Sequence, residues 1–156
     1  MTTPLTKEQF TALLQPIADA LRAVDVEHEG AAKACEQLLP FRGSVVANLQ
    51  AAALAAIDSD WLLPKANAGI RFGRVAKDLC GFSVDAVLMD QPGPKHRHPN
   101  GEIDLCFARS GDPKFDGKPA GWVVYGKGSV HVPTVRGGEM LILYFLPAGA
   151  IEFVTA

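Results

Sequence analysis

The spacing of apolar residues changes near Pro64 and divides the chain into two predicted regions. Before Pro64, apolar side chains recur at intervals of three and four residues, which is the spacing of one helix face. Thr6 followed by Gln9 forms a capping-box pattern and predicts that a helix begins at Lys7. The same criteria predict helices over 7–24, 30–39 and 44–57, with Pro40 ending the second.

After Pro64 the chain consists of short apolar runs, rich in Val, Ile, Phe and Tyr, that are separated by Gly, Pro, Asn and Asp. This alternation is typical of antiparallel strands joined by turns. The runs cover 69–75, 82–89, 102–108, 121–125, 129–133, 139–146 and 150–155. We therefore expect an α+β protein in which a helical region over 1–64 packs on a small antiparallel β-barrel over 65–156.

The charge and the cysteines narrow the possible functions. The chain has 15 basic and 17 acidic side chains, and lysines and arginines form no run. This balance argues against nucleic acid and acidic membrane surfaces as partners. The absence of a long apolar segment and of a signal-like N-terminus predicts a cytoplasmic protein. Three widely spaced cysteines favour reduced thiols over a disulfide framework.

The segment from His96 to Glu102 has the residue types and spacing of a metal site. His96 and His98 share one side of an extended strand. Asn100-Gly101 predicts a tight turn, which would place Glu102 at the start of the neighbouring strand beside the two imidazoles. Two imidazoles and one carboxylate are a ligand set for divalent Fe, Mn, Ni or Zn. The alternative is an exposed turn with two incidental histidines.

Asp104 and His131 are candidates for further residues of this metal site. Alternation puts Asp104 and Cys106 on the same strand face as Glu102, and the apolar residues between them on the face that the helices would cover. Asp104 is then placed to transfer protons beside the metal. His131 shares a strand face with Ser129 and is the natural fourth ligand, although a hydrogen-bonded barrel histidine is an equal alternative.

The spacing His96-x-His98-x-x-x-Glu102 resembles the first motif of the cupin superfamily, which implies a jelly-roll barrel with a metal ion. In the second cupin motif the histidine lies five residues after a proline; counted from Pro133 that position is Gly138, whereas His131 precedes the proline. The helical first half and the stretches around His96 and His131 resemble, more narrowly, a family of hydroxylaminobenzoate lyases. This resemblance implies conversion of 4-hydroxylaminobenzoate to 3,4-dihydroxybenzoate with release of ammonia.

A benzoate substrate needs a cation for its carboxylate and a surface for its ring. The candidate cations are Arg71, Arg97, Arg109 and Arg136, of which Arg71 lies among strand-like apolar residues and Arg97 lies between the histidines. Trp122 and Tyr125 are candidates for stacking on the ring, although strand aromatics usually belong to the core. In this hypothesis Glu102 and Asp104 are the catalytic residues.

Two other function classes fit the same residues. A site with two histidines and one carboxylate suits a cupin dioxygenase or an isomerase acting on a small aromatic or thiol substrate. A regulatory cupin that binds a small molecule without turnover is the non-enzymatic alternative. In each case we expect a small-molecule ligand and a homo-oligomer, namely a dimer.

Overall fold

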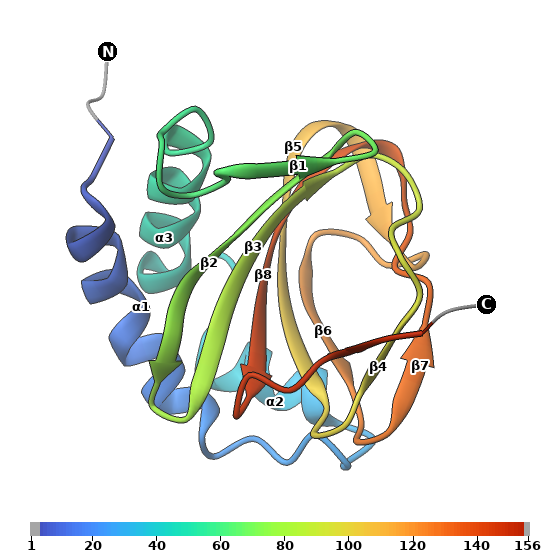
Figure 1. Ribbon diagram of the computed structural model, residues 1–156. Coiled ribbons are helices and arrows are strands. Elements are labelled where there is room, and N and C mark those ends of the chain that lie inside the picture. The colour runs from blue at the N-terminus through green and yellow to red at the C-terminus, as the bar shows by residue number, and fades with distance from the viewer. Residues whose placement is uncertain (1–3, 155–156) are drawn as a thin grey trace.

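The computed structural model describes residues 4–154 of the 156-residue chain, and this part contains three helices and nine strands (Figure 1). The helices are α1 (Lys7–Leu21), α2 (Ala31–Leu38) and α3 (Ser44–Ala55). The strands are β1 (Lys65–Asn67), β2 (Ile70–Leu79), β3 (Phe82–Met89), β4 (His96–His98), β5 (Glu102–Phe115), β6 (Gly121–Tyr125), β7 (Ser129–His131), β8 (Val135–Pro147) and β9 (Glu152–Phe153).

The first helix begins as the sequence predicts and ends earlier. The Thr6 hydroxyl accepts a hydrogen bond from the Gln9 amide at 3.1 Å, and the Gln9 side chain accepts one from the Thr6 amide at 2.9 Å, so the capping box is confirmed. After Leu21 the amides bond to carbonyls three residues back, and the last residues of the predicted range to Val24 form turns. Within residues 4–154, no helix combines the length and the apolar character that crossing a membrane requires.

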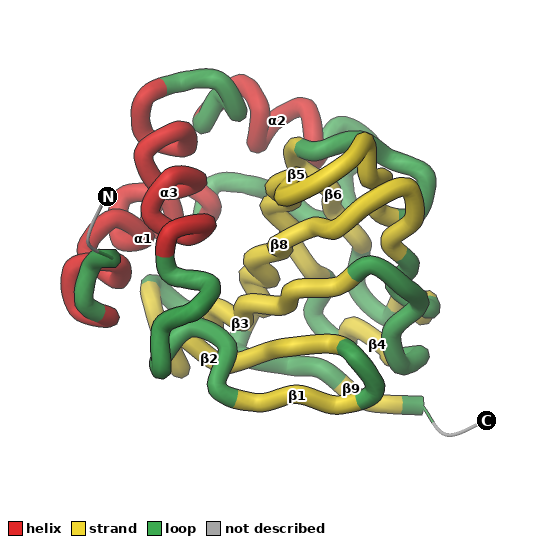
Figure 2. Tube along the Cα trace, turned by 90° about the horizontal axis from the view of Figure 1, so that it is seen from above, coloured by secondary structure: helices red, strands yellow, loops and turns green. Residues whose placement is uncertain are grey.

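The strands form two antiparallel sheets instead of the closed barrel that the sequence predicts. One sheet has six strands in the order β1-β2-β3-β8-β5-β6, and the other has three in the order β7-β4-β9. Within the described residues no strand pairing joins the two sheets. Figures 1 and 2 show the helices on one side of the larger sheet and β4 on the other.

Two central strands are longer than predicted. β3 and β6 have the predicted bounds, whereas β5 and β8 pair with each other from Ile103 opposite Phe145 as far as Phe115 opposite Val135. Shifts in register within this pairing accommodate glycines that, from the sequence, indicate the end of a strand. The predicted strand over 150–155 is reduced to β9, and Thr155 lies outside the described residues.

The turn at Asn100-Gly101 forms, but it does not make the predicted hairpin. β4 pairs only with β7 and β9, while β5 pairs with β6 and β8, so the two strands flanking the turn belong to different sheets. Gly101 has a φ of +85°, and a Cβ at this position would lie 2.7 Å from Val26 and 2.9 Å from the Tyr125 carbonyl. The turn therefore carries the chain across the interior, and Glu102 faces the histidines from the opposite sheet.

The two faces of the larger sheet have different contents. The face toward the helices is apolar and shares one hydrophobic cluster with them; its strand residues include Val84, Ala86, Leu88, Ile103, Leu105, Phe107, Trp122, Leu141, Leu143 and Phe145. The face toward the smaller sheet carries Glu102, Asp104 and Cys106 among apolar residues such as Met140, Ile142 and Leu146. The alternation predicted for β5 is confirmed.

Candidate metal centre

Four side chains from three strands converge between the two sheets. His96 and His98 come from β4, Glu102 from the start of β5, and His131 from β7, where it lies opposite His96 in the strand pairing. Each residue offers one ligand atom, and these four atoms lie within 4.8 Å of one another. The Nε2 atoms of His98 and His131 are 2.9 Å apart, and His98 Nε2 is 3.3 Å from a Glu102 oxygen.

The residues present fit a metal ion. Glu102 is fully buried, and neither of its carboxylate oxygens has a hydrogen-bond partner; the same holds for His96 Nε2 within the described residues. Such groups are costly to bury unless something satisfies them. Two donor atoms that bind one ion at about 2.1 Å lie about 3–3.4 Å apart. The spacing around His98 Nε2 matches that arrangement, and imidazoles with a carboxylate suit a divalent transition metal.

Neighbouring groups orient the imidazoles. His131 Nδ1 lies 2.8 Å from a carboxylate oxygen of Asp116, and His96 Nδ1 lies 3.1 Å from the Pro94 carbonyl. Asp116 also accepts hydrogen bonds from the Tyr125 hydroxyl and from the Thr134 amide. Because the Nδ1 atoms of His96 and His131 are occupied in this way, their Nε2 atoms are turned toward Glu102.

Burial keeps two of the histidines neutral. It lowers the pKa of His98 to about 4 and also lowers the pKa of His96, although Glu102 opposes both shifts. Burial lowers the pKa of His131 as well, but the nearby carboxylates of Glu102, at 3.7 Å, and Asp116, at 2.8 Å, outweigh this effect and leave the pKa raised. A neutral imidazole is the form that binds a metal, so His96 and His98 are ready to act as ligands at neutral pH.

Asp104 lies beside the cluster without joining it. Its side chain is fully buried, and neither carboxylate oxygen has a hydrogen-bond partner among the described residues. Burial, reinforced by the nearby charge of Glu102, raises the pKa of Asp104 well above its usual value. Burial likewise raises the pKa of Tyr144, which lies opposite Asp104 on the adjacent strand. Both groups therefore favour their protonated forms.

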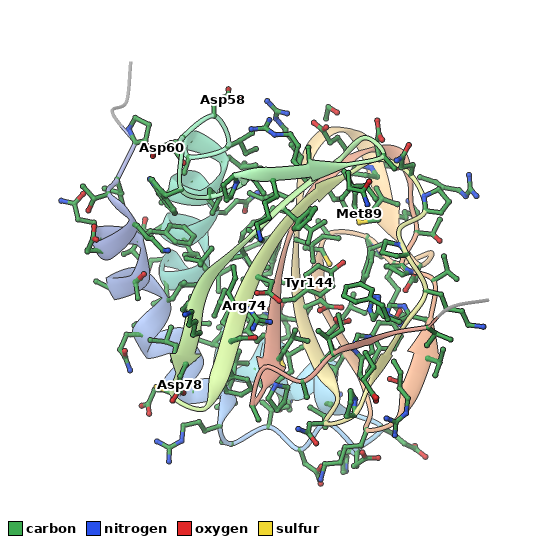
Figure 3. All side chains as sticks on the ribbon, in the orientation of Figure 1. Asp58, Asp60, Arg74, Asp78, Met89 and Tyr144 are labelled. Atoms are coloured by element: carbon green, nitrogen blue, oxygen red, sulfur yellow. The ribbon has the colours of Figure 1, made fainter. Side chains whose placement is uncertain are left out.

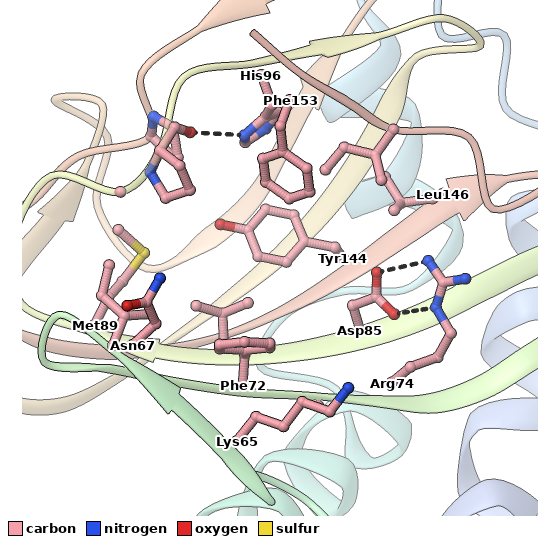
Figure 4. A pocket seen from close by; sticks show the side chains of 17 residues that line it. Lys65, Asn67, Phe72, Arg74, Asp85, Met89, His96, Tyr144, Leu146 and Phe153 are labelled. Carbon is pink, nitrogen blue, oxygen red and sulfur yellow. Dashed lines mark hydrogen bonds and ion pairs between the residues drawn. The ribbon is translucent and has the colours of Figure 1, made fainter. Parts of the chain in front are cut away.

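A pocket of about 610 Å³ opens next to the cluster, between the larger sheet and β9 (Figure 4). His96 lines it on one side, and the Tyr144 ring lies in its middle between Phe153 and Phe72. Arg74 is held by Asp85 through two hydrogen bonds of 2.7 and 3.1 Å at the opposite side. The pocket is largely apolar and aromatic, with polar groups at its two ends.

The structure places none of the four predicted arginines in this pocket. Arg71 donates to the Ile57 carbonyl at 2.7 Å and faces Asp58, at the helical end of the molecule (Figure 3). The other three are exposed on outer surfaces: Arg97 pairs with Glu152, Arg109 pairs with Glu139, and Arg136 lies on β8. None of the four lines the pocket, so the lining does not support the prediction that one of them binds a substrate carboxylate there.

The two predicted aromatic residues also lie outside the pocket. Trp122 faces the helices, and its indole nitrogen donates to the Leu39 carbonyl at 2.9 Å. Tyr125 lies inside the sheet pair but packs on His131, with 4.3 Å between ring centroids, and donates to Asp116. Trp122 is therefore a core residue, and Tyr125 packs against the histidine cluster outside the pocket lining.

Sequence reasoning missed Arg74, Tyr144 and Asp116. Arg71 attracts attention because Ile70 and Phe72 flank it, but strand alternation turns Arg71 away from the pocket and Arg74 toward it. Asp116 precedes Gly117, a pair that signals only a turn between β5 and β6. Only the alternation of side chains along β2 and β8 could have indicated that Arg74 and Tyr144 face the interior between the sheets.

The sequence of the chain is similar to those of known lyases. Residues 15–153 match the family described as PnbB, 4-hydroxylaminobenzoate lyase. The chain is 33% identical over 91 residues to a 4-hydroxylaminobenzoate lyase of Nocardioides sp. (strain LMS-CY), covering 53% of this chain and 54% of that protein. It is 32% identical over 88 residues to the Pseudomonas putida protein of the same name, covering 46% and 50%. The matches thus span about half the length of these curated relatives.

Solved structures give weaker similarities. An RmlC-like cupin protein from Ralstonia eutropha is 14% identical with a TM-score of 0.45, over 61% of this chain and 66% of that one. A chain from the complex of Rhodobacter sphaeroides SigE with the anti-sigma ChrR is 13% identical with a TM-score of 0.49, over 93% and 98%. At these TM-scores the similarity adds nothing to the fold described above.

Proposed function

Because the chain belongs to the 4-hydroxylaminobenzoate lyase family, we propose that it is a metal-dependent lyase that converts 4-hydroxylaminobenzoate to 3,4-dihydroxybenzoate and ammonia. The reaction consumes one water in balance: the hydroxylamino hydroxyl leaves as water, one water adds to the ring, and a second water hydrolyses the resulting imine, so that the nitrogen leaves as ammonia. The observation that carries this function is a buried cluster of unsatisfied metal ligands at one end of an aromatic pocket.

The metal in this proposal is held by His96, His98, Glu102 and His131. When bound, a divalent ion supplies Lewis-acid polarisation of an oxygen and lowers the pKa of a water molecule. The chain positions the ligands before the metal arrives, because Pro94 and Asp116 already orient two of the rings. We assign no identity to the ion, since the same donors suit Fe, Mn, Zn and Ni.

Asp104 and Tyr144 handle protons in this scheme. Loss of the hydroxylamino hydroxyl requires a proton, and Asp104 holds one because burial raises its pKa. Tyr144 lies opposite Asp104 on the next strand and lines the pocket, so in this proposal its hydroxyl meets the substrate and Asp104 is a second group that holds a proton. Glu102 balances the charge of the ion, and the apolar walls limit the entry of water to the reacting ring.

The ring of the substrate lies in the aromatic part of the pocket. Phe153 projects from β9 on one side, and Phe72 projects from β2 on the other, with Tyr144 between them (Figure 4). Aromatic side chains bind a benzene ring by offset or edge contacts. This lining supports a small substrate with an aromatic ring. We also propose that the protein forms a homodimer, which rests on the sequence alone. Sedimentation velocity measures this oligomeric state.

The test combines metal analysis with an assay for ammonia under anaerobic conditions. We expect the purified protein to hold a divalent transition metal and to release one ammonia per 4-hydroxylaminobenzoate without oxygen. His96→Ala should lose both the metal and the turnover, whereas His28→Ala, which alters an exposed histidine of the helical region, should keep both.

Three outcomes would contradict the proposal. If His96→Ala retains its metal and full turnover, the assignment of the metal site is wrong. Oxygen uptake with an aromatic substrate and no anaerobic ammonia would identify a dioxygenase. Binding of the aromatic acid without turnover in the metal-loaded protein would identify a small-molecule-binding module.

A further inference from the structure

The side of the pocket that faces away from the histidines carries two cations without any assigned role. Arg74 from β2 and Lys65 from β1 both line the pocket there, and Asp85 from β3 is the only acidic residue among the lining residues. Two cations and one carboxylate leave a net positive charge at this end. An aromatic pocket that ends in a net positive charge is suited to an anionic group on the ring.

The strand pairing gives the scale of the pocket. Four residues on the inner face form one row across the larger sheet: Asp104 lies opposite Tyr144, Tyr144 opposite Asp85, and Asp85 opposite Arg74. Neighbouring strands are about 4.8 Å apart, so Arg74 starts about 14 Å from Asp104 along this row. A para-substituted benzoate with a hydrogen bond at each end has to span a distance of this order if it is to interact with both ends of the row.

Asp85 fixes the guanidinium of Arg74 and leaves it able to bind a further acceptor. The Nε and Nη2 atoms donate to the two Asp85 oxygens at 2.7 and 3.1 Å, which sets the plane of the group. The Nη1 atom has no hydrogen-bond partner among the described residues and remains free to donate. Lys65 is exposed, lines the same pocket and adds a second donor. An arginine held this way loses little side-chain freedom when it binds an anion.

We propose that Arg74 and Lys65 bind the carboxylate of the substrate and thereby fix the ring so that its para substituent points to the histidine cluster. This role rests on the proposed function, because it names the group that the same pocket recognises. It also predicts selectivity: aromatic hydroxylamines that lack a carboxylate, or that carry it in the ortho position, should be poor substrates. Arg74 and Lys65 are specificity-determining residues here, and neither takes part in the proton transfers.

The test measures binding and does not depend on turnover. Calorimetry compares 4-aminobenzoate with 4-aminobenzamide, which has the same shape and no charge. We expect the native protein to prefer the carboxylate by about tenfold or more, the range for a hydrogen bond to a charged group. Arg74→Gln and Lys65→Gln should each reduce this preference several-fold, and the double variant should abolish it. Arg109→Gln, a surface arginine paired with Glu139, is the matched control and should keep the preference.

The outcomes separate this inference from the proposed function. If both variants keep the full preference, or if it disappears in His96→Ala instead, the carboxylate binds elsewhere and the inference is overturned. Ammonia release with an unchanged KM in both variants would overturn it while the lyase function stands. If the preference depends on Arg74 and Lys65 but no ammonia is released, the carboxylate site stands and the lyase function fails. Lys65 is exposed, so Lys65→Gln remains informative even if Arg74→Gln unfolds.

Discussion

The two faces of the six-stranded sheet are made by the same strands but differ in composition: one is apolar, and the other carries buried polar side chains. On the helix side, the side chains of β3, β5 and β8 are apolar and pack with α1, α2 and α3 in one cluster. On the other side, the same strands present Asp85, Glu102, Asp104 and Tyr144. All the buried side-chain atoms without a hydrogen-bond partner in residues 4–154, except Ser83 Oγ, belong to His96, His98, Glu102 or Asp104.

This contrast shows how one sheet supports both folding and chemistry. Burial of apolar area on the helix side supplies stability. The inner face opposes it, because buried polar atoms without partners cost free energy. Substitutions on the helix side should therefore mainly change stability, and substitutions on the inner face should mainly change metal binding and activity.

The largest effect on stability is expected on the helix side. Phe145 is fully buried, and its ring contacts those of Phe82 and Trp122 at centroid distances of 6.3 and 6.5 Å. Phe145→Ala should lower the free energy of unfolding by about 3–5 kcal/mol, because it removes a buried ring and leaves a cavity. Urea denaturation measures this loss. The metal content of the folded fraction should be unchanged; a loss of less than about 1 kcal/mol would contradict the assignment of this face.

On the inner face, a substitution should change activity strongly and stability little. Asp104→Asn keeps the size of the side chain and its neutral state but cannot release a proton, so the lyase activity should fall by about 10²–10⁴-fold. The free energy of unfolding should change by less than about 0.5 kcal/mol, because Asp104 has no hydrogen-bond partner to lose. Ammonia release and urea denaturation are the two measurements. Asp112→Asn, at an exposed position on β5, is the control. Full activity in Asp104→Asn would remove Asp104 from the reaction.

Asp116 tests whether the inner face is preorganised for a metal. Asp116→Asn should weaken metal binding by about 10–100-fold, because the Asp116 carboxylate orients His131 and accepts two further hydrogen bonds. Competition with a chelator of known affinity measures the change without requiring activity. Asp58→Asn, at an exposed position near the helices, should leave the affinity unchanged. An unaltered metal affinity in Asp116→Asn would show that Asp116 stabilises the turn between β5 and β6 and does not orient His131 for the metal.

The most gradual effect, spread over several pH units, is on the pH dependence of stability without metal. The pKa of His98 is about 4 in the folded protein and 6.5 in the unfolded chain, so the unfolded chain binds more protons between these values. The contribution of His98 to stability is therefore fully present above pH 6.5 and is lost as the pH falls toward 4, by up to about 1.4 kcal/mol per pH unit.

Denaturation of chelator-treated protein at several pH values between 4 and 7 measures this slope. His98→Gln should flatten it relative to the native protein, because the variant has no group that titrates in this range at that position. His28→Gln should leave the slope unchanged, since His28 is exposed. Equal slopes in the native protein and in His98→Gln would show that His98 is not held neutral by burial.

Much of the secondary structure and half of the site could be predicted from the sequence. Periodicity located the three helices and the strands β3 and β6, because each depends on local spacing. The alternation in β5 separated Glu102 and Asp104 from the apolar face for the same reason. His96 and His98 stood out because two histidines at a spacing of two residues must share a side of an extended strand.

The errors came from pairings between distant segments. The turn at Asn100-Gly101 has the local signal of a hairpin, and the sequence does not show that the next strand pairs with β8 and β6 in another sheet. The predicted arginines were chosen by their neighbours in sequence, whereas Arg74 reaches the pocket because β2 pairs with β3 beside Tyr144. Those partners lie about 11 and 70 residues away, so no local pattern contains them.

The sequence by itself determined which residues alternate, where the helices begin, and that two histidines and a glutamate lie within one short segment. The sequence left two roles open for His131, and the tertiary structure places it in the cluster. Only the tertiary structure shows that Asp116 holds the His131 ring and that Tyr144 and Arg74 line the adjacent pocket. The physical reason is that periodicity is a property of neighbouring residues, whereas a binding site is formed by side chains that meet only when two sheets pack against each other.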